Sequence, residues 1–261
     1  MGIVFTLCSE KYQESVRKKF LKWNEKRGLC PRYWVNENNS AVLKQKTELN
    51  VEWPEYDMDM FFAVTEFNDS ESVEKAIECA KIFRNTDKKE GTALSFCITL
   101  SKNFTNPVKT KISEVFDKII FVDEEEDLFK PVEILSIRFG EGSYINVDYA
   151  DVVWFLKDMK ELHFAKEIHA NKTKENYVLN LAEKIRANTT VNRNNLNIML
   201  HFDMVDNLLD LNEIDFTLTS FDEKYGIAKW NDIFVTGYIE EESSENGIYA
   251  LYGTKAEKTE G

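Results

Sequence analysis

The stretch Ile145-Asn146-Val147-Asp148-Tyr149-Ala150-Asp151-Val152 lies just past the middle of a chain of 261 residues. It follows Gly140-Glu141-Gly142 and leads into an apolar pattern that predicts a helix over 151–159. Asp148 and Asp151 are three residues apart, so both carboxylates lie on one face at the start of that helix. Carboxylates in this arrangement suit water orientation and general-base assistance, and they equally suit helix capping and compensation of the helix dipole. The residues by themselves leave both interpretations open.

Before this stretch, short apolar runs alternate with helical patterns. The predicted strands cover 3–7, 33–35, 60–64, 93–100 and 119–122. The predicted helices cover 10–26, 70–84 and 109–116, with Ser70 as the N-cap of the second. Runs that are apolar on both faces and alternate with helices are typical of a parallel sheet covered by helices. Residues 1–127 are therefore predicted to form a Rossmann-like domain.

After this stretch, the pattern changes to that of a smaller α/β domain, predicted over 143–253. Strand-like alternation is clearest at 196–202, where every second residue is apolar, and a helical pattern precedes it at 173–188. Two further strands are predicted at 233–240 and 248–252. The fold class is therefore α/β, with a Rossmann-like parallel-sheet domain packed with a smaller α/β domain.

The charge balance and the absence of long apolar runs disfavour several classes of protein. Acidic residues exceed basic ones, 46 to 33, and nucleic-acid binding is not expected because phosphate recognition needs concentrated Lys and Arg. No apolar run reaches the roughly 18 residues of a membrane-spanning helix. The first residues also turn polar too soon for a secretory signal. We expect a cytoplasmic protein with no direct membrane contact.

The cysteines and histidines do not form a metal-binding pattern. His163 and His169 are predicted to share one strand face, but no further ligands lie near them in the sequence. The cysteines are widely spaced, include no CxxC pair and are predicted to be buried small hydrophobic side chains. The four are Cys8, Cys30, Cys79 and Cys97. No metal site is expected.

The stretch 145–152 resembles a loop of the FtsZ family of bacterial tubulin homologues, whose pattern is Asn-x-Asp-Phe-Ala-Asp-Val. Further segments similar to that family follow in the same order at 30–45, 57–64, 195–212 and 232–241. The resemblance covers nearly the whole chain at low identity and identifies it as a divergent, shortened member of the tubulin/FtsZ superfamily.

The resemblance also implies how the chain is divided. It implies a GTPase-type Rossmann-like domain over 1–127, a shortened central helix at 128–142 and the family's C-terminal α/β domain over 143–253. A polar tail is expected at 254–261.

The loops that bind GTP in this family are altered in this chain. The family uses glycine-rich loops, because a side chain would block the approach of the backbone to phosphate. Here the first loop, 6–11, and the signature loop, 66–72, contain no glycine, and the latter carries three carboxylates that would repel polyphosphate. The resemblance therefore implies that GTP and magnesium are not cofactors of this chain. The degenerate phosphate-loop positions are Ser9, Asn68, Asp69 and Ser70.

The other half of the family's active site matches residue by residue. In FtsZ filaments, acidic residues of one subunit's loop polarise water against the GTP of the next subunit. Asn146, Asp148 and Asp151 correspond to that loop. The resemblance thus implies that these residues act on a neighbouring subunit and that the chain has no catalytic site of its own.

Three functional hypotheses follow. The first is a protein that caps, modulates or co-assembles with a filament of an FtsZ/tubulin-like protein, or associates with itself. The second is a divergent GTPase that forms its own polymers, with Lys11, Lys44 and Lys46 as candidate phosphate ligands. The third is a nucleotide-independent oligomeric scaffold that binds partners through aromatic side chains. The tryptophans available for this are Trp23, Trp34, Trp53, Trp154 and Trp230.

Overall fold

The computed structural model describes residues 2–25, 32–35, 59–86, 93–101, 106–136, 149–168, 173–188, 192–204, 211–227, 233–239 and 247–255. The chain forms two compact units, residues 1–136 (unit 1) and residues 137–261 (unit 2). Within the described ranges, none of the helices combines the length and the apolar character that crossing a bilayer requires.

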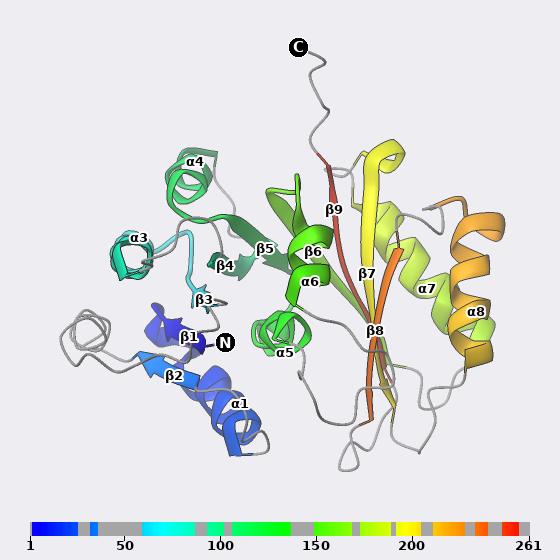
Figure 1. Ribbon diagram of the computed structural model, residues 1–261, viewed down its shortest axis with the longest axis horizontal. Coiled ribbons are helices and arrows are strands. Elements are labelled where there is room, and N and C mark those ends of the chain that lie inside the picture. The colour runs from blue at the N-terminus through cyan, green and yellow to red at the C-terminus, as the bar shows by residue number, and fades with distance from the viewer. Residues whose placement is uncertain are drawn as a thin grey trace. The chain divides into compact units, whose positions relative to one another are not determined.

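Unit 1 contains a parallel sheet in the order β2-β1-β3-β4-β5 (Figure 1). The β4 side chains from Ser95 to Leu100 are all buried, as expected for a strand covered on both faces. The sheet therefore has the parallel, helix-covered form that the apolar runs predict. Its strands are β1 (Gly2–Leu7), β2 (Arg32–Val35), β3 (Asp59–Val64), β4 (Leu94–Leu100) and β5 (Lys118–Val122).

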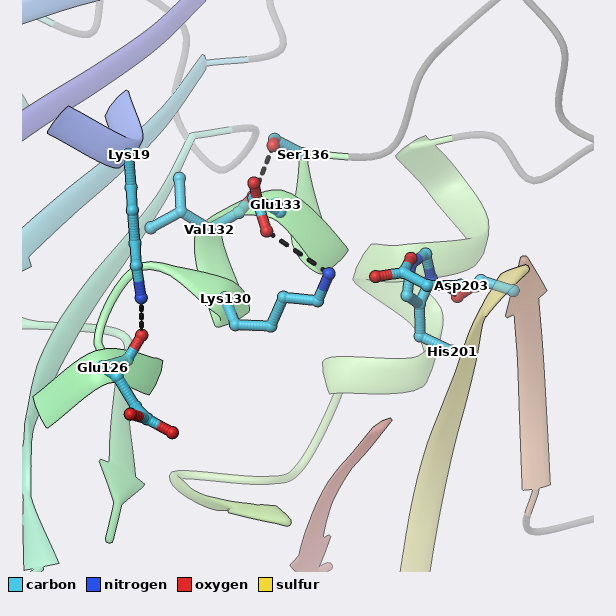
Figure 2. Close-up of polar contacts among 9 residues, drawn as sticks. Lys19, Glu126, Lys130, Val132, Glu133, Ser136, His201 and Asp203 are labelled. Atoms are coloured by element: carbon cyan, nitrogen blue, oxygen red, sulfur yellow. Dashed lines mark hydrogen bonds and ion pairs between the residues drawn. The ribbon is translucent and has the colours of Figure 1, made fainter. Parts of the chain in front are cut away.

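Helices cover both faces of this sheet. On one face, α3 (Ser70–Thr86) and α4 (Asn106–Val115) pack over β3, β4 and β5 (Figure 1). On the other, α1 (Gln13–Glu25) contributes Phe20, which stacks on Phe5 of β1 with ring centroids 5.5 Å apart. Lys19 of α1 also donates a hydrogen bond to the carbonyl oxygen of Glu126 (Figure 2). The described part of unit 1 also contains three short helices: η1 (Glu10–Tyr12), η3 (Glu125–Asp127) and α5 (Lys130–Leu135).

Three cysteines lie in the core between α3 and the sheet. Cys8, Cys79 and Cys97 are free thiols and belong to one hydrophobic cluster, which confirms the sequence prediction for these three. A hydrogen bond with Cys79, followed by burial, raises the pKa of Cys8 well above its ordinary value, and burial raises the pKa of Cys97. Cys30 lies outside the described residues.

Buried, protonated thiols are expected to be unreactive. In a Cys30→Ser variant at pH 8, an aromatic disulfide reagent should label no thiol of the folded protein within minutes, because the thiolate is the reacting species. The same protein in guanidinium should yield all three thiols. Rapid labelling of any of them in the folded protein would contradict their burial.

The pKa values of Cys8 and Cys97 are both raised in the folded protein. Their contribution to the free energy of unfolding is therefore complete below the ordinary thiol pKa and is lost as the pH rises above it.

Unit 2 contains a mixed four-stranded sheet in the order β6-β9-β7-β8 (Figure 1). β9 is antiparallel to both of its neighbours in this unit, and β7 and β8 are parallel. At Gly253 in β9, a Cβ atom would lie 2.3 Å from the carbonyl oxygen of Glu161 in β6, so this close approach requires glycine. The strands are β6 (Glu161–Ile168), β7 (Leu196–Met204), β8 (Ile233–Ile239) and β9 (Gly247–Thr254).

The two faces of the unit 2 sheet are covered differently. On one face, α7 (Lys174–Ala187) and α8 (Leu211–Thr219) bury the apolar face of β7 formed by Leu196, Ile198, Leu200 and Phe202 (Figure 1). On the other face, α6 (Tyr149–Leu156) places Phe155 against Phe234 of β8, with ring centroids 5.7 Å apart. A π-helical turn, η5 (Ser220–Lys224), continues α8.

The predicted fold class is confirmed in each unit: unit 1 has a Rossmann-like parallel sheet, and unit 2 has an α/β arrangement on a smaller sheet. Of the predicted central-helix segment at 128–142, the structure describes residues 128–136, in which α5 spans six residues. The remainder of that segment lies outside the described residues.

Candidate functional site

The carboxyl edge of the unit 1 sheet brings two distant loops together. In open parallel α/β sheets, this edge is where ligands bind. The amide of Cys8, which follows β1, donates a hydrogen bond to the carbonyl oxygen of Val64 at 2.9 Å. The amide of Thr65, which follows β3, donates one to the carbonyl oxygen of Ile98 at 3.0 Å. The sheet ladder thus continues into both loops and fixes them next to each other.

Ser72, a buried residue in the first turn of α3, makes hydrogen bonds to the loop that follows β3. Its hydroxyl oxygen lies 2.7 Å from the Thr65 hydroxyl oxygen and accepts a hydrogen bond from the amide of Glu66 at 3.1 Å. Backbone amides at such a loop are the groups that would bind a phosphate. The Glu66 amide is already satisfied by the chain itself.

Asp69, not Ser70, is the N-cap of α3. The Asp69 carboxylate accepts a hydrogen bond from the amide of Glu71 at 3.0 Å, and its carbonyl accepts one from the amide of Val73 at 3.1 Å. The prediction of Ser70 as the cap was wrong by one residue, because either type can cap a helix and only the backbone shows where the first turn begins. The positive end of the α3 dipole therefore faces a carboxylate of its own loop.

The two loops are joined by an ion pair between Lys11 and Glu66. The Lys11 ammonium lies 3.1 Å from the Glu66 carboxylate and 5.3 Å from the centroid of the buried Tyr12 ring. The hydrogen bond to Glu66 raises the pKa of Lys11 above its ordinary value. Lys11 is one of the candidate phosphate ligands, and its charge is compensated here. Lys44 and Lys46 lie outside the described residues.

The four degenerate phosphate-loop positions differ in their exposure. Ser9 is buried, whereas Asn68, Asp69 and Ser70 are exposed. At this edge the structure thus shows a Glu66 amide bonded to Ser72, a helix capped by Asp69 and an exposed ion pair between Lys11 and Glu66.

Ser72→Ala is expected to lower the free energy of unfolding of unit 1 by about 1–2 kcal/mol, because it leaves the buried Thr65 hydroxyl and the Glu66 amide without their partner. Ser70→Ala is the matched control: it removes the same hydroxyl from an exposed position in the same turn and should change stability by less than about 0.5 kcal/mol. Urea denaturation of both variants measures the difference. Equal losses of stability in the two variants would show that the Ser72 hydroxyl does not stabilise the loop after β3.

The second predicted site lies at the start of α6. Asp151 is exposed in the first turn of this helix, where its carboxylate is favourably placed for the helix dipole. Asn146 and Asp148 lie outside the described residues, so the structure describes one of the three predicted residues. The helix ends at Leu156, three residues before the predicted end.

Unit 2 contains a buried row of hydrogen-bonded polar side chains that the sequence did not predict. The Nδ1 atom of His201 lies 2.7 Å from the Thr236 hydroxyl oxygen. Its Nε2 atom lies 2.8 Å from a carboxylate oxygen of Asp203, and Figure 2 shows these two side chains. All three side chains are buried on the β7 and β8 face opposite the apolar residues of β7. The alternation along β7 places His201 and Asp203 on one face, but their contact with Thr236 depends on strand register. Among the described residues, no group of three or more His, Cys, Asp or Glu side chains could hold a metal ion.

The sequence matches no family profile and no curated protein. Solved structures with similar folds exist. An FtsZ dimer of M. jannaschii, solved empty, superposes with a TM-score of 0.64 at 11% identity, covering 98% of this chain and 89% of that one.

Two further relatives in structure come from protofilaments. CetZ2 from Haloferax volcanii, a GTPγS-bound protofilament, gives a TM-score of 0.57 at 11% identity, with 98% of this chain and 94% of that chain covered. TubZ of Bacillus thuringiensis serovar israelensis, in GDP-form protofilaments, gives a TM-score of 0.51 at 10% identity, with 85% of this chain and 69% of that chain covered. The chain therefore has a tubulin/FtsZ-like fold, as the resemblance of residues 145–152 predicts.

Proposed function

We propose that this chain acts by protein–protein association in the cytoplasm, where it caps, modulates or co-assembles with a filament of an FtsZ/tubulin-like protein, and that it does not bind GTP. The observation that carries the proposal is the carboxyl edge of the unit 1 sheet. There, Glu66 compensates Lys11 and Asp69 caps α3. A polyphosphate would have to displace the first contact and approach the second carboxylate.

The similarity to solved protofilaments supports the association part of the proposal. The CetZ2 and TubZ structures are filaments of subunits with this fold. Asp151, exposed at the start of α6, belongs to the segment that resembles the loop acting on a neighbouring subunit. A subunit that keeps this loop and lacks a nucleotide can dock on a GTP-bound subunit but cannot present GTP to another.

The experiment is an assembly assay with purified FtsZ from the same organism. Substoichiometric addition of this chain is expected to change polymer mass or length in sedimentation and light scattering. Asp151→Asn should weaken the effect, whereas Asp215→Asn, an equally exposed change on α8, should not. Unchanged FtsZ assembly would contradict the proposal.

Two other results would replace the proposal with the remaining hypotheses. GTP hydrolysis by the purified chain, lost in Asp151→Ala, would identify a polymerising GTPase. A stable oligomer without nucleotide, combined with no effect on FtsZ, would identify a scaffold.

A further inference from the structure

Trp154 is an aromatic side chain that unit 2 holds out into solvent. It is 61% exposed and is the one large hydrophobic side chain exposed in the described parts of the chain. The opposite side of α6 is well packed, with Val152, Phe155 and Leu156 buried and Phe155 stacked on Phe234. Trp154 is therefore exposed because of its position on a firmly held helix, and not because the helix packs poorly.

A cation already lies over this ring. The Lys255 ammonium is 5.7 Å from the centroid of the Trp154 ring, a distance at which a cation is attracted by the electron-rich face of an aromatic ring. Lys255 is brought there by its backbone, since its amide donates to the carbonyl of Asn195 at 3.1 Å just after β9 ends. The chain itself thus shows that the ring accepts a basic side chain.

A carboxylate lies on the same side of α6 as the ring. Asp151 is exposed and lies one helical turn before Trp154 within α6. An aromatic face next to a carboxylate matches the arginine side chain, whose flat guanidinium stacks on the ring while its N–H groups reach the carboxylate. The net charge of −13 adds a long-range attraction for basic partner surfaces.

We propose that Trp154 and Asp151 form a docking point for an arginine side chain on a partner protein, and that Lys255 occupies the ring until the partner arrives. The proposal rests on the association function proposed above and specifies the chemistry of the partner surface. Trp154 is the anchor, Asp151 orients the guanidinium, and Lys255 is an internal competitor.

A blocked Gly-Arg-Arg-Gly peptide is the probe, followed by the indole N–H signal of Trp154 in ¹⁵N-labelled protein and assigned with Trp154→Phe. The signal should shift saturably. Asp151→Asn should weaken binding about threefold, and Lys255→Ala should strengthen it about threefold because the competitor is removed. Lys160→Ala, which removes an exposed lysine after α6, should leave binding unchanged.

These variants separate docking at the ring from general electrostatic attraction. If only the overall charge mattered, Lys255→Ala and Lys160→Ala would strengthen peptide binding equally, whereas docking predicts that Lys255→Ala alone strengthens it. No saturable shift, or equal effects of Lys255→Ala and Lys160→Ala, would overturn the proposal. Dimerisation that depends on Trp154, observed by sedimentation, would also overturn it in favour of a second copy as the occupant.

The filament assay separates this proposal from the one on which it rests. If the unmodified chain and its Trp154→Ala variant change FtsZ assembly equally, the proposed arginine docking point is wrong and the proposed association function stands. If the chain leaves FtsZ unchanged while the peptide binds as expected, the association with FtsZ is wrong and the docking point serves another basic partner.

Discussion

Phe61→Ala is expected to lower the free energy of unfolding of unit 1 by about 3–5 kcal/mol, the largest effect predicted for this chain. Phe61 is fully buried in the middle of β3 and stacks on Phe83 of α3 and Phe116, with ring centroids 5.2 and 6.0 Å apart. Alanine would leave a cavity at the junction of the sheet with α3 and the end of α4.

Hydrogen exchange resolved by peptide, together with urea denaturation, measures this effect. Exchange should increase in β3, β4 and α3 of unit 1. Phe61→Leu, which retains most of the volume, should cost less than about 1.5 kcal/mol. A loss below 1 kcal/mol for Phe61→Ala would mean that the aromatic cluster is not part of the stable core.

His201→Leu is expected to cost about 2–4 kcal/mol of stability in unit 2, because it leaves the buried Thr236 hydroxyl and Asp203 carboxylate without the ring that lies between them. A leucine has similar bulk, so the loss reports the polar contacts more than the packing. Urea denaturation with exchange of the β7 and β8 peptides measures it.

His163→Leu is the control for this prediction. His163 lies on the other face of the same sheet, in β6, and is partly exposed. Its replacement should cost less than about 1 kcal/mol. Equal losses for the two histidines would show that the chain of His201, Thr236 and Asp203 does not stabilise the pairing of β7 with β8.

Local patterns in the sequence were sufficient for the fold class and for most elements. The runs that form β3, β4 and β5 are continuous and apolar, and such runs bury both faces in a parallel sheet. The helical stripe of α6, with Val152, Phe155 and Leu156 on one side, also indicates that Trp154 points away from the core. This signal was available in the sequence, although tryptophans are usually buried.

Contacts between distant residues could not be predicted in the same way. Lys11 and Glu66 are 55 residues apart and meet because β1 and β3 are neighbours in the sheet. His201 and Thr236 are 35 residues apart and meet because β7 and β8 pair in one particular register. Strand order and register are set by the whole core, so no local pattern specifies these contacts.

We propose that no nucleotide binds at the carboxyl edge of the unit 1 sheet. Isothermal titration calorimetry of the purified chain with GTP and GDP, each with and without magnesium, tests it most directly. No heat beyond that of dilution is expected, because Glu66 compensates Lys11 and Asp69 caps α3. Binding at micromolar affinity would contradict this proposal and would identify the chain as a nucleotide-binding member of this fold.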